Sequence, residues 1–342
     1  MHRLLLALLL GCTHFTLVES QPVETTLDRG ALPEAYAVWP QMIDRARERI
    51  DFAEMYAVDE APSRLTPVVA AVGRALGRGV RVRWLAAASF AKTYPDLLAW
   101  LEQHGAKVKR LEKPFLHAKY FVVDGHDAYL GSQNFDWRSL EHIQELGVRF
   151  DSPKEVAALE DVFETDWMGE PHAAADAGRL RGSPQGPVPW DLPELVKLVD
   201  SARASVRVQV LTYGNDIDPL RDALVRAAAR GVSVQLLTSD WELRPKTLPS
   251  IERLDPRVQV RILTIPKSSK GDIPFARVAH AKYCVVDGAR GWVGTGNWER
   301  DYFEKSRNVG LFFDGGEIPQ QLAAFFANNW NSAYAAPPGG RP

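Results

Sequence analysis

Two short stretches of the chain each place a histidine two residues before a lysine. They are His117-Ala-Lys119 and His280-Ala-Lys282, and each continues after two residues into Val-Val-Asp-Gly. Alternate residues of a strand share one face, so each stretch would project an imidazole beside an ammonium group. An ammonium group repels a metal cation and attracts an anion such as a phosphate. The pattern therefore predicts chemistry on an anion at these histidines, with no metal site and no cofactor.

Each stretch is expected to enter a β-hairpin that brings further polar groups to the histidine. Residues 117–123 are rich in β-branched and aromatic types, and Asp124-Gly125 is typical of a hairpin turn. If Val123 pairs with His126, the residue opposite His117 is a serine, followed by an asparagine. The polar residues gathered in this way are Ser132 and Asn134 in the first copy and Thr295 and Asn297 in the second.

A phosphodiester held between the two copies could be cut by both histidines acting together. One neutral imidazole can attack phosphorus to form a phosphohistidine, while the other, protonated, gives its proton to the departing alcohol. Because like charges oppose double protonation, the pair should hold about one proton at mildly acidic to neutral pH. Lysine and asparagine donors would stabilise the charge on the non-bridging oxygens. We therefore expect a metal-free reaction with a bell-shaped pH profile.

The two copies belong to an internal duplication that covers most of the chain. Equivalent residues are 163 positions apart from His117 to His280, but 152 apart upstream, from Arg74 to Arg226. The second half therefore holds 11 extra residues before its motif. Loops rich in Pro, Gly and Ser are the expected places for them. These loops are residues 241–249 and 266–274.

Within each half, helical stretches alternate with β-rich runs. This alternation predicts an α/β fold, with two tandem duplicated α-β-α sandwich domains packed as a pseudo-dimer. A segment rich in Ala, Gly and Pro at residues 171–189 is expected to be the linker. The domains are accordingly placed at residues 22–170 and 190–336. Since one chain carries both motifs, no obligate protein partner is expected.

Composition limits the class of protein. The 342 residues are 46% hydrophobic and 25% charged, which fits two folded domains. A net charge of −2 supplies no general field that would attract nucleic acid or anionic lipid, so any grip on a polyanion must be local. Two cysteines, Cys12 and Cys284, are too few for a disulfide framework or a cysteine-based zinc site.

The N-terminal residues have the pattern of an export signal. A basic residue precedes the apolar run Leu4–Leu10, which is too short to cross a bilayer. The signal is expected to occupy residues 1–20, with cleavage after Ser20. Alternatively it ends before Cys12, which would then carry a lipid as in a bacterial lipoprotein and attach the protein to a membrane. Either cleavage predicts an exported protein, in the periplasm, anchored at the cell envelope, or secreted.

The doubled pattern His-x-Lys-x4-Asp followed by Gly-Ser/Thr-x-Asn resembles the HKD motifs of the phospholipase D superfamily. Most of the chain is similar to the branch that contains animal lysosomal phospholipase D-like exonucleases and viral envelope phospholipase-like proteins. The residues that carry this resemblance are 129–140, 145–147, 294–298 and 301–303. It implies a metal-independent phosphodiesterase with two phospholipase D-like domains that share one active site.

The resemblance also implies roles for individual residues. His117 would be the nucleophile and His280 the general acid. Asp124 and Asp287 belong to the motifs, although capping of the hairpin turn is the simpler role for both. The residues that match the family's phosphate ligands are Lys119, Lys282, Asn134 and Asn297.

One further acid is implied, and here the two halves differ. Glu145 would orient a motif histidine, but its counterpart 163 residues later is Asn308. Orientation of the second histidine is therefore expected from Glu304 or from a backbone carbonyl.

The expected substrate is single-stranded nucleic acid that is cut from an end. The similar branch includes exonucleases, and the aromatic residues Phe135, Trp137 and Trp298 beside the motif asparagines could stack on bases, unless they pack in the core. Basic residues before the first motif and in the extra loops could form a rim for a phosphate chain, or a solvated face. They are Lys107, Lys109, Arg110, Lys113, Lys246, Lys267 and Lys270. The alternatives are a phospholipase D or transphosphatidylase acting on phospholipids, and a non-catalytic phosphate-binding homologue.

Overall fold

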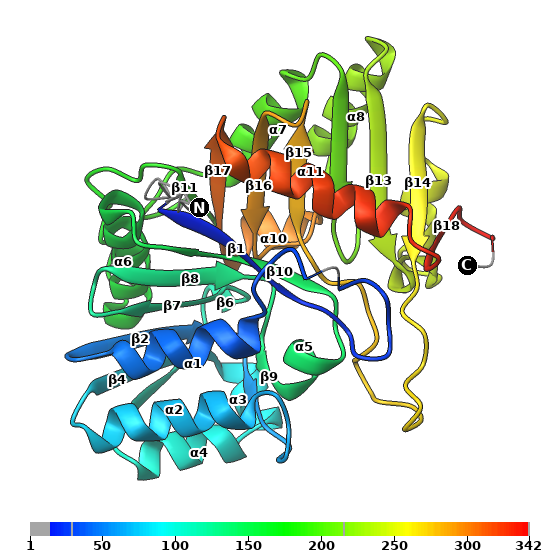
Figure 1. The fold of residues 1–342 in the computed structure, drawn as a ribbon. Coiled ribbons are helices and arrows are strands. Elements are labelled where there is room, and N and C mark those ends of the chain that lie inside the picture. The colour runs from blue at the N-terminus through cyan, green and yellow to red at the C-terminus, as the bar shows by residue number, and fades with distance from the viewer. Residues whose placement is uncertain (1–13, 29, 215, 341–342) are drawn as a thin grey trace, which may run out of the picture.

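Two mixed β-sheets, one in each half, form the framework of the protein (Figure 1). The computed structural model describes residues 14–28, 30–214 and 216–340. Among these residues the first sheet has the strand order β1-β10-β8-β7-β2-β4-β5. The second sheet runs β11-β17-β16-β15-β12-β13-β14-β18, and β6 joins it by pairing with β17.

The first half is an α-β-α sandwich. Its strands are β1 (Phe15–Ser20), β2 (Arg49–Glu54), β4 (Arg81–Ala87), β5 (Lys107–Leu111), β7 (Lys119–Val123), β8 (Asp127–Gly131) and β10 (Glu145–Phe150), with the small pair β3 (Ala57–Val58) and β9 (Phe135–Asp136) beside them. Its helices are α1 (Ala35–Arg45), α2 (Thr66–Gly77), α3 (Ala88–Thr93), α4 (Asp96–Gln103), α5 (Trp137–Glu141) and α6 (Pro153–Met168). Buried residues of α1, α2 and α4 pack on one face of the sheet and those of α6 on the other.

The second half repeats this plan. Its strands are β11 (Leu180–Ser183), β12 (Ser205–Gln209), β13 (Ser233–Ser239), β14 (Val258–Leu263), β15 (Tyr283–Val286), β16 (Arg290–Gly294), β17 (Ser306–Asp314) and β18 (Ala335–Ala336), and β6 (Phe115–Leu116) reaches it from the first half. Its helices are α7 (Asp191–Asp200), α8 (Asp218–Ala229), the 3₁₀ turn η1 (Asp240–Leu243), α9 (Leu248–Glu252), α10 (Arg300–Glu304) and α11 (Glu317–Trp330). The predicted α/β fold with two duplicated halves is confirmed.

Both motif strands are buried on two faces, and their side chains alternate between two cores. In β7, Tyr120 contributes to a core shared by the two halves, whereas Phe121 faces the core under α1 and α2. In β15, Tyr283 joins the same shared core, and Cys284 faces the core under α7 and α8. Because one continuous apolar core links the halves, they are held together as one body.

The register of the two hairpins differs by one from the expected register. Val123 pairs with Asp127 rather than His126, and Val286 pairs with Arg290. The turn has positive φ angles at Asp124 (53°) and Gly125 (73°), a conformation that Asp and Gly tolerate. The turn therefore contains three residues between the paired positions. Because this shifts the register by one, Ser132 does not lie opposite His117.

The extra residues of the second half all lie in one segment. Lys107 of β5 pairs with Arg83 of β4, and the residues 152 positions later, Gln259 of β14 and Gln235 of β13, pair in the same way. The spacing of 152 therefore persists through β14. Between these strands the halves have the same length, and the expectation of extra residues at 241–249 is wrong. They fall between Leu263 and His280.

A cleavage after Ser20 would remove a strand of the first sheet. Residues Phe15–Ser20 form β1, which pairs antiparallel with β10 along its whole length, and Leu17 and Val18 are fully buried. The alternative cleavage before Cys12 lies outside the described residues. At the other boundary, the expected linker contains β11, which pairs with β17 and so belongs to the second sheet. No helix in the described ranges is long and apolar enough to span a membrane.

Truncation of the chain at Gln21 is expected to destabilise it severely. Removal of β1 would expose the edge of β10 and lose the burial of Leu17 and Val18, at about 1.5–3 kcal/mol for each side chain. Thermal unfolding of chains that begin at Thr13 and at Gln21 tests this. Equal melting temperatures would show that β1 contributes nothing to stability.

Acidification is expected to stabilise the fold through Glu19, a buried carboxyl of β1. Burial raises its pKa to about 7, although a hydrogen bond from Gln21 Nε2 (2.6 Å) opposes the shift. The folded state therefore holds a proton between about pH 7 and the unfolded value of 4.5, so stability rises as the pH falls through this window. A Glu19→Gln variant should be more stable than the parent at pH 8, by on the order of 1–3 kcal/mol, and similar to it at pH 4.5. Urea unfolding at both pH values would contradict this if the difference did not depend on pH.

Candidate active site

The structure brings the two motifs together at one cavity between the halves. His117 lies between β6 and β7, and His280 lies just before β15. Both histidines, with Asn134 and Asn297, line a cavity of about 510 Å³. Both imidazoles are largely buried, with the His117 residue 5% exposed and the His280 side chain 12%. Two residues 163 positions apart in the sequence thus face one shared space.

Each histidine is oriented by a side chain from the other half. His117 Nδ1 lies 2.9 Å from Asn308 Oδ1, and His280 Nδ1 lies 2.9 Å from Glu145 Oε2. Glu145 therefore orients the second histidine, and the expectation that Glu304 or a carbonyl does so is wrong. Glu304 instead pairs with Arg300 on the surface.

Backbone hydrogen bonds reinforce this exchange between the halves. The His117 N–H donates to the carbonyl of Arg307 (3.1 Å), and the His280 N–H donates to the carbonyl of Gln144 (2.7 Å). Each acceptor directly precedes the residue that bonds the imidazole. The packing of the two halves therefore sets the position of both motif strands and both imidazole rings.

The hydrogen bonds of Asn308 determine which atom faces His117. Asn308 Nδ2 donates to the carbonyls of Tyr302 (2.9 Å) and Ser306 (3.3 Å), while its Oδ1 accepts from Thr295 Oγ1 (2.9 Å). Its oxygen therefore faces the ring, so His117 carries its proton on Nδ1 and has a lone pair on Nε2.

Glu145 presents a buried carboxylate to His280. The Glu145 side chain is fully buried, and its second oxygen accepts a hydrogen bond from Ser139 Oγ (2.5 Å). The Ser139 hydroxyl in turn accepts the backbone N–H of Asn134 (3.0 Å). A negative charge at this place favours a protonated imidazole more strongly than the hydrogen bond of the neutral Asn308 amide does.

Burial and charge act differently on the two imidazoles. Burial, with added repulsion from Lys119 and Lys282, holds the pKa of His117 well below 6.5. Burial also lowers the pKa of His280, to about 4, but there Glu145 opposes the shift. His117 is therefore neutral in the empty site. A bound anion would favour protonation of His280, the ring that already has a carboxylate partner.

Two fully buried lysines lie under the cavity. The Lys119 ammonium donates to the carbonyl of His117, and Lys282 donates to that of His280. Burial lowers the pKa of Lys119 to about 7, against the opposing charges of Glu54 and Glu145. Burial likewise holds the pKa of Lys282 well below its usual value. A bound phosphate would supply the negative charge that keeps both lysines protonated.

The predicted serine and threonine do not line the cavity. Ser132 and Thr295 are fully buried, and their hydroxyls accept the backbone N–H groups of Leu146 (3.0 Å) and Val309 (3.1 Å). They tie each hairpin to the strand that carries Glu145 or Asn308. The structure therefore places them as supports of the orienting residues and not in contact with a substrate.

Trp298 was expected to contact the substrate, but it is a core residue. Its side chain is fully buried and packs against Trp292, with ring centroids 6.4 Å apart. Phe135 is likewise buried, stacked on Trp39. Each motif asparagine lines the cavity, whereas the aromatic residue that follows it packs in the core. Sequence spacing alone does not tell a cavity residue from a core residue.

The motif aspartates lie at the far end of the hairpins. Asp124 accepts three backbone N–H groups at the start of β2, from residues 47–49 at 2.8 Å each, and Asp287 accepts those of residues 203–205. Although partial burial opposes the shift, these donors lower the pKa of both carboxyls. Both residues cap the turn, and neither is among the residues that line the catalytic cavity.

Several residues near the histidines were missed by sequence reasoning. The ring of Tyr302 stands edge-on to His117, with centroids 4.6 Å apart, and its counterpart 163 positions earlier is Ser139. Glu54, which pairs with Lys119 across β2 and β7, is buried and its pKa is raised well above the usual value by burial. The repeat spacing places a serine at the position equivalent to Tyr302 and so does not mark it, and nothing in the sequence marks Glu54.

Aromatic side chains, and not lysines, make up the walls of the cavity. On the side of the first half, Tyr56 stacks on Phe90, with centroids 5.5 Å apart, and Tyr94 and Phe115 complete the wall. Two of the basic residues expected to form a rim are engaged elsewhere. Lys109 donates to carbonyls at the end of α6, and Arg110 pairs with Glu102.

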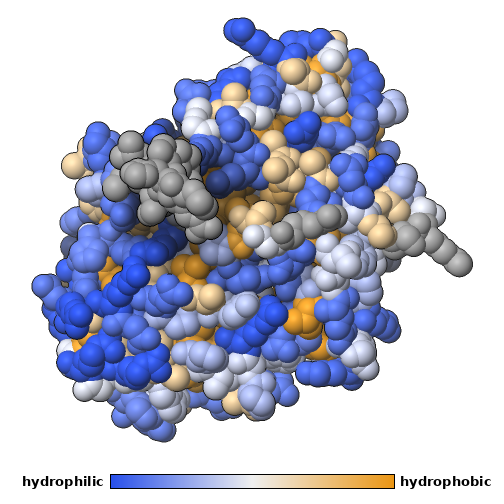
Figure 2. All heavy atoms as spheres, in the orientation of Figure 1, coloured by the Kyte–Doolittle hydropathy of each residue, from blue (hydrophilic) through white to orange (hydrophobic). Residues whose placement is uncertain are grey.

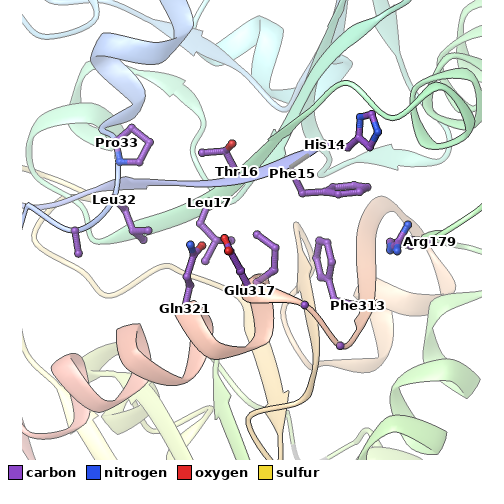
Figure 3. Close-up of a pocket in the computed structure, with 14 residues that line it drawn as sticks. His14, Phe15, Thr16, Leu17, Leu32, Pro33, Arg179, Phe313, Glu317 and Gln321 are labelled. Carbon is purple, nitrogen blue, oxygen red and sulfur yellow. The ribbon is translucent and has the colours of Figure 1, made fainter. Parts of the chain in front are cut away.

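A second cavity, of about 440 Å³, lies between β1 and the start of α11 (Figure 3). Phe15 and Phe313 meet edge to face beside it, with centroids 5.3 Å apart. None of the described residues that line it belongs to the two motifs.

Elsewhere on the face drawn in Figure 2, hydrophilic residues predominate and apolar residues form small separate patches. The phosphate chemistry is therefore assigned to the cavity between the histidines.

Comparison with known proteins agrees with this site. A family model described as "Cardiolipin synthase, PLD-like domain" matches residues 40–167 and 195–330. The chain is 31% identical to mouse 5'-3' exonuclease PLD4, over 93% of this chain and 78% of that protein. It is 29% identical to phospholipase D Z of Dictyostelium discoideum, over 94% and 90% of the two chains. The crystal structure of phosphatidylserine synthase from Haemophilus influenzae shares the fold, with a TM-score of 0.63 at 12% identity over 88% of this chain and 85% of that one. Two copies of the family domain, joined at a cavity lined by both motif histidines, show that the chain belongs to the phospholipase D superfamily and is a phosphodiesterase.

Proposed function

We propose that this phosphodiesterase hydrolyses single-stranded nucleic acid from an end, through a phosphohistidine on His117. The observation that carries the proposal is the aromatic wall beside the histidines, where Tyr56, Phe90 and Tyr94 offer flat faces to a base. The mouse relative, which covers most of the chain, is named as a 5'-3' exonuclease.

In the first step His117 acts as the nucleophile. Its Nε2 lone pair attacks phosphorus, the N–P bond forms, and the bond from phosphorus to the leaving oxygen breaks. His280 gives its Nε2 proton to that oxygen as the bond breaks. The difference between Asn308 and Glu145 supports these roles. Burial keeps His117 neutral beside an uncharged amide, whereas a carboxylate partner stabilises a protonated His280.

In the second step water releases the product. His280, now neutral, takes a proton from water, which attacks phosphorus as the N–P bond breaks. Lys119, Lys282, Asn134 and Asn297 hold the non-bridging oxygens in both steps. The buried lysines provide a large effect here, since charge is stabilised most strongly where water is excluded.

A side-by-side substrate panel tests the proposed function. The mature protein is expected to release nucleotides from a linear single-stranded oligonucleotide, and a His117→Ala variant to release none. Oligonucleotides blocked at the 5′ or the 3′ end show which end is attacked. Activity on phospholipid alone would overturn the nucleic-acid assignment while leaving the histidine chemistry intact.

The second candidate is a phospholipase D or transphosphatidylase. It is favoured by the apolar side chains of the cavity, such as Met55, Leu211 and Val278, and by the relative named phospholipase D Z. Headgroup release from phosphatidylcholine vesicles, and headgroup exchange in added primary alcohol, would identify it. The intact histidines, lysines and asparagines of both motifs argue against a non-catalytic homologue.

Export of the protein is also a proposal. It is supported by the basic and apolar N-terminal pattern. Cell fractionation of the full chain and of a Cys12→Ser variant separates a lipid-anchored form from a soluble exported form. Retention of the full-length chain in the cytoplasm would refute export.

A further inference from the structure

The residues that distinguish the second half form a long segment beside the active site. This segment, Thr264–Val278, connects β14 to the residues just before His280, and we call it the strap. In Figure 1 it runs, yellow to orange, from the end of β14 toward the blue segment that follows β1. The corresponding connection in the first half is 11 residues shorter and contains β6.

The strap is fastened to the first half of the protein. Ser269 donates its N–H and its hydroxyl to the carboxylate of Glu24 (2.9 and 2.5 Å). Arg277 donates its Nη1 to the carbonyl of Val23 (2.7 Å) and its N–H to that of His142 (3.0 Å). The strap starts in the second half and is hydrogen-bonded to the first half, so it bridges the two halves on one side of the histidines.

The strap also meets the aromatic wall of the first half. Arg138 Nη1 donates to the carbonyl of Pro274 (3.2 Å), and its guanidinium lies 5.8 Å from the ring centroid of Tyr94 in that wall. On the opposite side, Arg244 lies 3.9 Å over the ring of Trp241. Since residues of both walls and of the strap line the same cavity, the strap joins the two walls.

Phe275 is the large hydrophobic residue of the strap that is exposed. It lines the catalytic cavity but is 65% exposed, which is unusual for a large apolar side chain. Its φ of 61° lies in the left-handed region, where a bulky residue is strained. The neighbouring Pro274 carbonyl and the Arg277 guanidinium hold the backbone on both sides of it. The surrounding hydrogen bonds therefore keep an aromatic ring at the mouth of the site despite backbone strain, which is typical of a ligand contact.

We propose that the strap is an end-stop. It closes the groove on one side of the histidines and presents Phe275 as the surface on which the terminal base of a single strand stacks, so that strand ends enter the site and strand interiors do not. The inference rests on the proposed hydrolysis of nucleic acid and adds the reason for attack at an end. An aromatic side chain that stacks on one base contributes about 10- to 100-fold to binding.

The test compares a linear single-stranded oligonucleotide with the same sequence closed into a circle. The full chain is expected to degrade the linear form and to cut the circle at least about 100-fold more slowly. A Phe275→Ala variant should raise KM for the linear form about 10- to 100-fold with kcat nearly unchanged, whereas a separate Phe275→Trp variant, which keeps an aromatic ring, should have the parental KM. The matched control is Met168→Ala, which removes an equally exposed apolar side chain at the end of α6, away from the cavity.

Three results would overturn the proposal. Cleavage of the circle at a rate near that of the linear form would show that the groove is open. An unchanged KM in a Phe275→Ala variant that melts like the parent would show that no base stacks there. If the parent cuts neither oligonucleotide but releases headgroup from phosphatidylcholine vesicles in a His117-dependent reaction, the proposed function fails together with the end-stop. The first result would leave hydrolysis of nucleic acid standing but not attack at an end, and the second would leave the proposed function intact.

Discussion

A Glu145→Gln variant is expected to lose about 10²- to 10³-fold in kcat with little change in KM. The Glu145 carboxylate lies 2.9 Å from His280 Nδ1 and opposes the burial that lowers the pKa of that histidine. An amide in its place removes the charge that stabilises the imidazolium, so His280 is protonated in a smaller fraction of the enzyme. Activity falls as pH rises through the pKa of the general acid, and the basic limb of the pH profile should move to lower pH. Steady-state kinetics between pH 4 and 8 measure both effects.

Asn308→Asp is the matched control for Glu145→Gln because it adds a carboxylate to the other histidine. A carboxylate at Asn308 Oδ1, 2.9 Å from His117 Nδ1, would raise the pKa of the nucleophile. Since His117 attacks only when neutral, the acidic limb should move to higher pH. Opposite limbs are therefore expected to shift in the two variants. Movement of the same limb in both, or a parental kcat in Glu145→Gln, would contradict the assigned roles.

A His280→Ala variant is expected to accumulate the phosphohistidine when the leaving group needs no proton. With an alkyl leaving group the loss should be about 10²- to 10⁴-fold, because the general acid is missing. With a 4-nitrophenyl diester the leaving group departs as the anion, so His117 is still phosphorylated. Release by water is slow without the base, and stopped-flow absorbance should show a burst of one equivalent of nitrophenolate. Intact-protein mass spectrometry would detect the acid-labile adduct.

The reciprocal variant separates the nucleophile from the acid. His117→Ala should lose on the order of 10⁴- to 10⁶-fold on both substrates and show no burst, because nothing attacks phosphorus. His104→Ala is a neutral control, since that ring lies exposed at the end of α4, where it bonds the carbonyl of Trp100 and stacks on its ring, away from the cavity. A burst in His117→Ala that is absent from His280→Ala would exchange the two roles.

Features that depend on neighbouring residues were predictable from the sequence. Alternation in the motif strands, the Asp-Gly turns and the doubled histidine–lysine pairs are local patterns, since strand periodicity and turn conformation are set by adjacent residues. The duplication multiplied this local information, because a pattern found in one half could be checked in the other. The histidines, lysines and asparagines singled out in this way lie together in the structure, at one cavity or directly beneath it.

Some local patterns were nevertheless misjudged. A hairpin register depends on one residue in the turn, and the three-residue connection moved Ser132 away from His117. Part of the segment expected to be an export signal, residues 15–20, forms β1 in the structure. A short apolar strand and the end of a signal peptide have similar compositions. The composition of residues 15–20 is compatible with a signal peptide and with a strand, and in the structure these residues pair with β10 as a strand.

The sequence by itself determined the family, the duplicated fold and the residues of the two motifs, because each of these is written in short-range patterns that occur twice. Only the tertiary structure decided that Asn308 serves His117 and Glu145 serves His280, since these bonds join residues 191 and 135 positions apart across the interface of the halves. It also decided that Trp298 packs in the core and that the strap carries Phe275 to the mouth of the site. Such contacts depend on how two folded surfaces pack, and packing is a property of side chains brought together from distant parts of the chain.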